Sequence, residues 1–185
     1  MRVAEASAVV PLSPEEAWDL LIGDQMHRLV EMPDVSVVAV EDYLVRPDGT
    51  ARYTVANKAG PSTTWHTADF TVYERPHRSV NRVLDSPFGG TFYGAYEPTA
   101  EGTRVTWRWE IEPQTPLTTV LLPVMRPLLA QSMQHDLDAL AKVGGATPEE
   151  RRSTPARARL LGGVVVVGAV LVLYMLRRRS GASRK

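Results

Sequence analysis

The sequence predicts an α+β domain in which a curved antiparallel sheet of about seven strands wraps around a long C-terminal helix. Two short helices are expected after the first strand, and one transmembrane helix after the domain. Three observations support this prediction. Residues 35–112 alternate between extended stretches and turns that contain proline or glycine. An apolar stripe at helical spacing follows over 117–142, and an uncharged apolar run occupies Leu160 to Leu176.

The first strand is expected over residues 2–10, and a helix follows it. Ser13 is a good N-cap, Pro14 suits the first helical position, and Glu16 lies three residues past the cap, as in a capping box. This helix is predicted to run to about residue 22. A second short helix is predicted over 24–30, where a proline ends it.

Six further strands are expected between residues 35 and 112. They cover 35–45, 51–57, 64–74, 79–85, 92–97 and 103–112. The signals that separate them are turn sequences such as Pro47-Asp48-Gly49 and the segment from Ser86 to Gly90, which is expected to form a turn.

The last strand alternates between apolar and polar residues. Its apolar face carries Val105, Trp107, Trp109 and Ile111. Such alternation indicates a sheet that is covered on one face, and the helix over 117–142 is the element available to cover it. Pro123 and Pro127 predict a kink or a separate turn in the first half of this helix. A long helix across a curved sheet leaves a gap, where a ligand is expected.

Three stretches of the chain resemble the START-like (SRPBCC) superfamily, in particular its bacterial polyketide cyclase/dehydrase-like members. They are Val9-Val-Pro-Leu-Ser-Pro-Glu-Glu-Ala-Trp18, Gly102-Thr-Arg-Val-Thr-Trp-Arg-Trp-Glu110 and Leu137-Asp-Ala-Leu140. The resemblance covers about residues 2–143 and implies the helix-grip fold. It also implies a hydrophobic ligand, such as a lipid, a sterol or a polyketide, and in a minority of members a reaction on that ligand.

The hairpin between the last two strands predicts which side chains face the helix. It sets the pairs Tyr96–Val105, Gly94–Trp107 and Phe92–Trp109. The same alternation, carried back to the preceding strands, places Val80, Arg82 and Leu84 on this face, and before them His66, Ala68, Phe70 and Val72. A slip of one residue in any hairpin would exchange the two faces. The predicted cavity lining is His66, Phe70, Val80, Arg82, Phe92, Tyr96, Trp107, Trp109, Met125, Leu129 and Met133.

Two polar residues stand out on this predicted face. Arg82 lies between two apolar residues, and a buried guanidinium needs a partner, so it either holds the polar head of a ligand or pairs with a carboxylate at the domain edge. His66 is interpreted first as a structural residue. The tryptophans at 18, 107 and 109 are interpreted first as core.

The sequence contains no motif for catalysis or for a metal site. Histidines, aspartates and glutamates do not cluster at metal-ligand spacing, and neither a nucleophile elbow nor a glycine-rich phosphate loop occurs. No cofactor is expected. The chain contains no cysteine, so it has no disulfide bond.

The net charge of zero conceals an acidic body and a basic tail. Residues 1–145 carry 12 Lys and Arg against 19 Asp and Glu, and residues 146–185 carry nine against two. A basic tail suggests an anionic partner, and the apolar run favours a lipid surface over nucleic acid. At about 1.5 Å per residue the 17-residue run spans about 25 Å as a helix, which is short but sufficient for a bilayer.

The predicted organisation is a ligand-binding domain over 1–145, a linker over 146–158, a transmembrane helix over 159–178 and a basic tail over 179–185. No signal peptide is apparent at the N-terminus, so we expect a tail anchor in the cell membrane with the domain in the cytoplasm. Basic residues flank the run on both sides, so the positive-inside rule does not fix its orientation.

The leading functional interpretation is a membrane-tethered protein that binds a hydrophobic small molecule or lipid between sheet and helix. One alternative is a polyketide cyclase/dehydrase-type enzyme that acts on a hydrophobic substrate, although no catalytic motif supports it. The other is a membrane-anchored interaction adaptor whose core is filled by side chains. A nucleic-acid partner is not expected because the body is acidic.

Overall fold

The computed structural model describes residues 3–32, 34–59 and 62–144. Its elements are strand β1 (Val3–Val10), helix α1 (Pro14–Leu21), 3-10 helix η1 (Met26–Glu31), strands β2 (Val37–Val45), β3 (Ala51–Ala59), β4 (Ser62–Glu74), β5 (Arg78–Leu84), β6 (Phe88–Thr99) and β7 (Gly102–Pro113), and helix α2 (Pro116–Gly144). The order of strand, two short helices, six strands and long helix is the predicted one.

The predicted linker, transmembrane helix and basic tail over 146–185 lie outside the described residues. Within the part of the chain that the structure describes, no helix combines the length and the apolar character needed to cross a bilayer.

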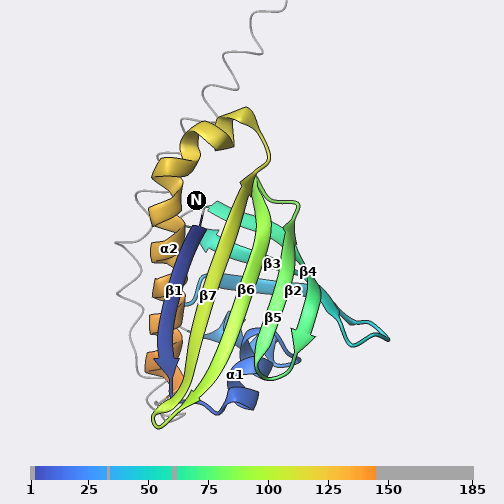
Figure 1. Ribbon diagram of the computed structural model, residues 1–185, viewed down its shortest axis with the longest axis vertical. Coiled ribbons are helices and arrows are strands. Elements are labelled where there is room, and N and C mark those ends of the chain that lie inside the picture. Colours follow the sequence, from blue (N-terminus) through green and yellow to red (C-terminus); the bar gives the residue numbers. More distant parts are fainter. Residues whose placement is uncertain (1–2, 33, 60–61, 145–185) are drawn as a thin grey trace, which may run out of the picture.

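The seven strands form one antiparallel sheet in the order β1-β7-β6-β5-β4-β3-β2. Figure 1 shows that the sheet curls: β5, β6 and β7 run roughly along α2, whereas β2 and β3 cross behind them at a steep angle. Helix α2 lies beside β1 and β7, and α1 lies at the opposite end of the molecule from the start of α2. The side of the sheet that faces α2 is called the inner face below.

Helix α1 begins as its sequence predicts. The Glu16 backbone N–H donates to Ser13 Oγ at 3.3 Å, and the Ser13 backbone N–H donates to Glu16 Oε2 at 2.9 Å. This capping box satisfies two of the donors that a helix start leaves without partners. The helix then buries Ala17, Trp18 and Leu21 against the sheet.

Two local expectations need correction. Helix α2 continues as a helix through Pro123 and Pro127, so the separate turn is wrong, whereas the bend in its first part agrees with the predicted kink (Figure 1). Strand β6 begins at Phe88, so Gly89 and Gly90 belong to a strand and not to a turn. Gly90 has a φ of +123°, and a Cβ atom there would collide with the backbone oxygen of Glu110. Gly90 therefore allows close approach of β6 to β7.

Strand β4 carries one extra residue, Thr71, relative to β5. Phe70 pairs with Asn81, but Val72 already pairs with Val80, so the pairing shifts at Thr71. A bulge of this kind exchanges the two faces of the strand beyond it. As a result Tyr73, which pairs with Ser79, turns inward, and Val72 faces outward, contrary to the prediction.

The C-terminal half of α2 is tied to both edges of the sheet by side-chain hydrogen bonds. Asp136 accepts from the Ser36 backbone N–H at 2.8 Å and from Ser36 Oγ at 2.6 Å, just before β2. Gln134 accepts from the Ser7 backbone N–H at 3.2 Å and donates to the Ser7 carbonyl at 3.1 Å, within β1. Both ties lie in the second half of the helix.

We expect the substitution Asp136→Ala to lower the free energy of unfolding by about 1–3 kcal/mol, because it removes two hydrogen bonds from Ser36 and leaves its part-buried backbone N–H without an acceptor. The matched control is Asp138→Ala two residues away, which removes an exposed carboxylate that pairs with Gln134. This control substitution should lower the free energy of unfolding by about 0.5 kcal/mol or less. Equal losses in urea titrations of the two variants would contradict the proposed tie.

Candidate functional site

The register of β6 and β7 places a set of aromatic residues on the inner face. Tyr96 pairs with Val105, Gly94 with Trp107 and Phe92 with Trp109, as the sequence predicts. Residues directly opposite each other on antiparallel strands share a face, and Val105 is fully buried. Phe92, Tyr96, Trp107 and Trp109 therefore all lie on the inner face.

One half of the interior is filled by a cluster of aromatic rings, called the aromatic cluster below. It consists of Trp18, Tyr53, Phe70, Tyr73 and Tyr96, with ring centroids between 4.8 and 5.5 Å apart for the contacting pairs. Phe70 and Tyr96 are fully buried in it. These two residues lie on the inner face and are packed in the core, and their part in lining a ligand cavity stays a prediction. Trp18 is core, as expected.

The other half of the inner face carries smaller side chains. Here Ala68, Val83 and Gly90 form one row of paired residues across β4, β5 and β6. Trp109 lies one row from this region, and Trp107 lies two rows from it, in the row of Tyr73. Both remain only partly buried although they face inward, as do Phe92 and, on α2, Leu129. The predicted Met125 and Met133 of α2 are buried. These partly buried side chains make this part of the inner face the candidate place for a ligand.

Asn81 is a buried polar residue on this apolar surface. It pairs with Phe70 on one side and with Phe92 on the other, so its side chain faces inward, and it is 5% exposed. No hydrogen bond to its amide group occurs among the described residues. In the same row the indole N–H of Trp109 is also buried, and it has no partner in this part of the chain. Leaving such groups unpaired costs stability, which makes them candidates for contact with a ligand.

His66 lies on the inner face and belongs to a chain of polar groups that reaches α2. Its Nδ1 is 3.4 Å from the amide nitrogen of Asn57, and Ser36 Oγ donates to Asn57 Oδ1 at 3.2 Å. Ser36 in turn donates to Asp136. Burial lowers the pKa of His66, and burial raises the pKa of Asp136 against the opposing effect of the bonds from Ser36. The histidine is therefore held neutral near pH 7.

Arg82 lies on the outer face, so its predicted place in the cavity is wrong. It pairs with Thr91, and its guanidinium donates to Glu112 at 3.1 Å with about half of the side chain exposed. Val80 pairs with Tyr93 and is also on the outer face, although its neighbours there bury it. The register of β5 is one residue away from the predicted register. The reason is energetic: an amide costs less to bury than a guanidinium.

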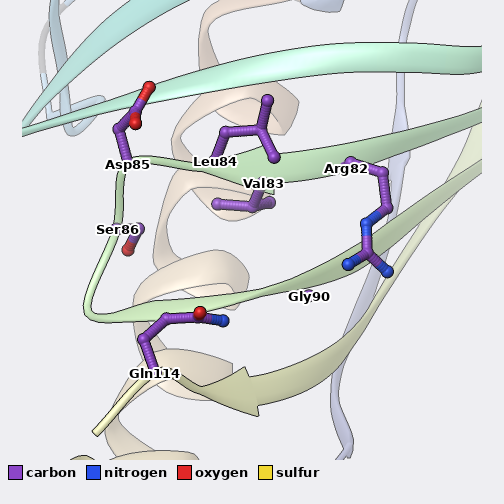
Figure 2. Close-up of a pocket in the computed structure, with 7 residues that line it drawn as sticks. All are labelled: Arg82, Val83, Leu84, Asp85, Ser86, Gly90 and Gln114. Atoms are coloured by element: carbon purple, nitrogen blue, oxygen red, sulfur yellow. The ribbon is translucent and has the colours of Figure 1, made fainter.

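Arg82 borders a small pocket of about 260 Å³ at the rim of the sheet. Figure 2 shows it between the ends of β5 and β6 and the segment after β7, with Asp85 and Ser86 in the turn and Gln114 opposite. Pockets for small organic ligands have volumes of about 300–1,000 Å³ and mostly apolar walls. This rim pocket is smaller and has charged walls, so it is a weaker candidate than the inner face.

Sequence reasoning missed Asn81 because it had no means to fix the register of β5. The useful signal was present in the dipeptide Asn81-Arg82, where one residue must face inward and the other outward. Burying an amide costs less free energy than burying a guanidinium, so this comparison selects Asn81 as the inward residue.

Within the described residues, no group of three His, Asp or Glu side chains converges as a metal site.

A family model described as "Polyketide cyclase / dehydrase and lipid transport" matches residues 1–145. No curated protein matches the chain. Among solved structures, TTHA0849 from Thermus thermophilus superposes with a TM-score of 0.62 at 18% identity, over 77% of this chain and 96% of that one.

Two further structures show the same fold. The di-domain ARO/CYC StfQ from the steffimycin biosynthetic pathway has a TM-score of 0.61 at 15% identity, over 82% of this chain and 52% of that chain, so this protein spans about half of it. Protein Ms6760 from Mycobacterium smegmatis has a TM-score of 0.56 at 14% identity, over 78% and 91% of the two chains.

The lowered pKa of His66 predicts a pH-dependent contribution to stability. The unfolded chain protonates this imidazole at a higher pH than the folded chain, so the contribution is present above about pH 6.5 and is lost as the pH falls further. As the pH falls from about 8 to about 5.5, we expect the free energy of unfolding of the wild type to decrease relative to that of His66→Gln. A difference that is constant over this range would contradict the burial of His66.

Proposed function

Because the chain belongs to the polyketide cyclase/dehydrase and lipid transport family, we propose that its hydrophobic ligand lies on the inner face, next to Asn81. The family supports a hydrophobic ligand-binding or cyclase-type domain. The buried amide of Asn81, unpaired among the described residues on an otherwise apolar surface, is the observation that carries the finer assignment. It indicates a ligand that is mainly apolar but has a group able to form a hydrogen bond.

The arrangement of the inner face explains how such a ligand would be held. Phe92, Trp107 and Trp109 offer ring surfaces, and Leu129 of α2 is partly buried against the same core. The aromatic cluster closes one end of this space. The indole N–H of Trp109 adds a second donor in the row of Asn81. An oxygen of the ligand could therefore accept from Trp109 while Asn81 donates or accepts.

Cyclase- or dehydrase-type chemistry is the second candidate function, and His66 is the observation that favours it. This histidine faces the interior and stays neutral, and Asn57 lies beside one of its ring nitrogens. It is therefore positioned to exchange a proton with a bound molecule. An adaptor with a filled core is the third candidate, and the partial burial of Phe92, Trp107 and Trp109 on the inner face argues against it.

We propose further that the apolar run Leu160 to Leu176 tethers this domain to a lipid bilayer. The support is the sequence itself: 17 residues without a charge, with arginines on both sides. A tether of this kind keeps the domain where apolar molecules are concentrated. It suits a protein whose ligand partitions into lipid.

Mass spectrometry of residues 1–145 is the direct test of ligand binding. The matching fold makes up 96% of the TTHA0849 chain, so this part of the chain should fold by itself. We expect a co-purifying compound with a long apolar part and at least one oxygen or nitrogen. A dehydrase would yield two related masses that differ by one water molecule, and a cyclase without dehydration would yield two isomers of the same mass. Purification of an empty domain, with no compound extracted by organic solvent, would contradict both candidate functions.

Asn81 and Arg82 provide a matched pair of variants because they are adjacent but face opposite sides of the sheet. Asn81→Leu should weaken binding of the co-purified compound by roughly tenfold, the value of one hydrogen bond. The same substitution should raise the free energy of unfolding by about 1 kcal/mol, because it removes a buried group without a partner. Arg82→Met should leave the affinity unchanged.

These affinities can be measured by titration calorimetry on delipidated protein. If Arg82→Met weakens binding and Asn81→Leu does not, the site lies on the other face of β5. If neither substitution changes the affinity, Asn81 is not in the site.

A further inference from the structure

The first half of α2 exposes apolar side chains that no other described element covers. Val120 is 75% exposed, Val124 is 65% exposed and Leu117 is 41% exposed. At 100° per residue these three positions fall on one stripe of the helix, together with Leu121 and Leu128. The buried residues Thr118, Leu122 and Met125 lie on a different side of the helix. This half of α2 therefore has two apolar sides, one toward the domain and one toward the outside.

The charge distribution of this segment differs from that of the rest of the domain. Residues 113–135 contain no aspartate or glutamate, and Arg126 is their only lysine or arginine. The body as a whole has 19 acidic residues over 1–145. An acidic surface is repelled by anionic lipid headgroups, but this stripe is not.

We propose that this stripe (Leu117, Val120, Leu121, Val124 and Leu128) docks on the surface of a lipid bilayer. An amphipathic helix that lies in the membrane interface buries its apolar face by about 5–10 Å. The inference rests on the proposed tether, because a domain held at the membrane meets the bilayer at a high local concentration. The same helix packs against β1 and β7, and β7 carries Trp107 and Trp109 of the proposed ligand site.

The lengths of the linker and the helix permit this orientation. Residues 145–159 separate the end of α2 from the apolar run, and 15 residues can extend to about 50 Å. Helix α2 has 29 residues, so it is about 44 Å long. The linker begins at the C-terminal end of α2, and its extended length is greater than the length of the helix. The N-terminal half of α2 can therefore turn toward the same bilayer.

A labelling experiment on the full chain tests the proposal, and the absence of native cysteine removes background labelling. Single-cysteine variants Val120→Cys and Val124→Cys are labelled with the environment-sensitive dye NBD. The matched controls are Leu44→Cys and Val45→Cys, which replace apolar residues of β2 that are 57% and 53% exposed. Each protein is reconstituted into vesicles of phosphatidylcholine and phosphatidylglycerol.

Two quenchers then distinguish lipid from water: a doxyl group on the phospholipid and iodide in the buffer. We expect the dye at 120 and 124 to be quenched several times more strongly by the doxyl lipid than the dye at 44 and 45. Iodide should quench the dye at 44 and 45 more strongly than the dye at 120 and 124. Circular dichroism of each variant confirms that it is folded.

The other outcomes separate the docking from the tether. If the chain floats with the vesicles but iodide quenches all four positions, the tether stands and the docking is wrong. If the chain does not float with the vesicles, both are wrong. If positions 120 and 124 are protected from both quenchers, the stripe is covered by a second copy or another part of the chain, and the lipid assignment is wrong.

Discussion

The extra residue in β4, Thr71, is the constraint on which the interior of this domain depends. Because of it Tyr73 faces inward, where its hydroxyl donates to the Ile22 carbonyl at 3.1 Å and its ring contacts Trp18 and Phe70. The aromatic cluster thereby fills the half of the interior next to α1 and fixes the end of that helix. The neighbouring rows of paired residues carry the small side chains of Ala68, Val83 and Gly90 and the partly buried rings of Phe92 and Trp109. The bulge thus fixes which side chains form the closed core beside the proposed ligand site.

The placement of polar groups follows from the same division. Arg82 faces outward, where Glu112 and water offset its charge, and Asn81 takes the inward position. Asp136, Ser36 and Asn57 satisfy one another in a chain that ends near His66. Among the described residues, the buried polar atoms without a partner are Trp18 Nε1, the Tyr96 hydroxyl, Arg108 Nε and the indole N–H of Trp109. Asn81 is buried in the row of Trp109. A ligand on the inner face would give Trp109 and Asn81 a hydrogen-bond partner.

The elements of this fold could be predicted from the sequence because their signals are local. Ser13 and Glu16 specify the start of α1 within four residues, and the alternation of β7 specifies its faces. The hairpin of β6 and β7 was predicted in its correct register because few residues separate the two strands. The register of β5 and the bulge at Thr71 could not be predicted in this way, since both depend on packing between distant residues. The one-residue error in the register of β5 is the reason that the sequence predicts Arg82 to face the cavity.

The central claim is that a ligand occupies the inner face beside Asn81 and Trp109, and the four tryptophans of the chain allow a direct test. Each gives one indole N–H signal in a proton–nitrogen NMR spectrum. Trp18 belongs to the closed core, Trp65 is exposed on the outer face, and Trp107 and Trp109 face the proposed site. On return of the extracted compound to delipidated protein, the Trp109 signal should shift downfield as its N–H gains an acceptor, and those of Trp18 and Trp65 should stay in place. An unmoved Trp109 signal at saturating ligand would contradict the account.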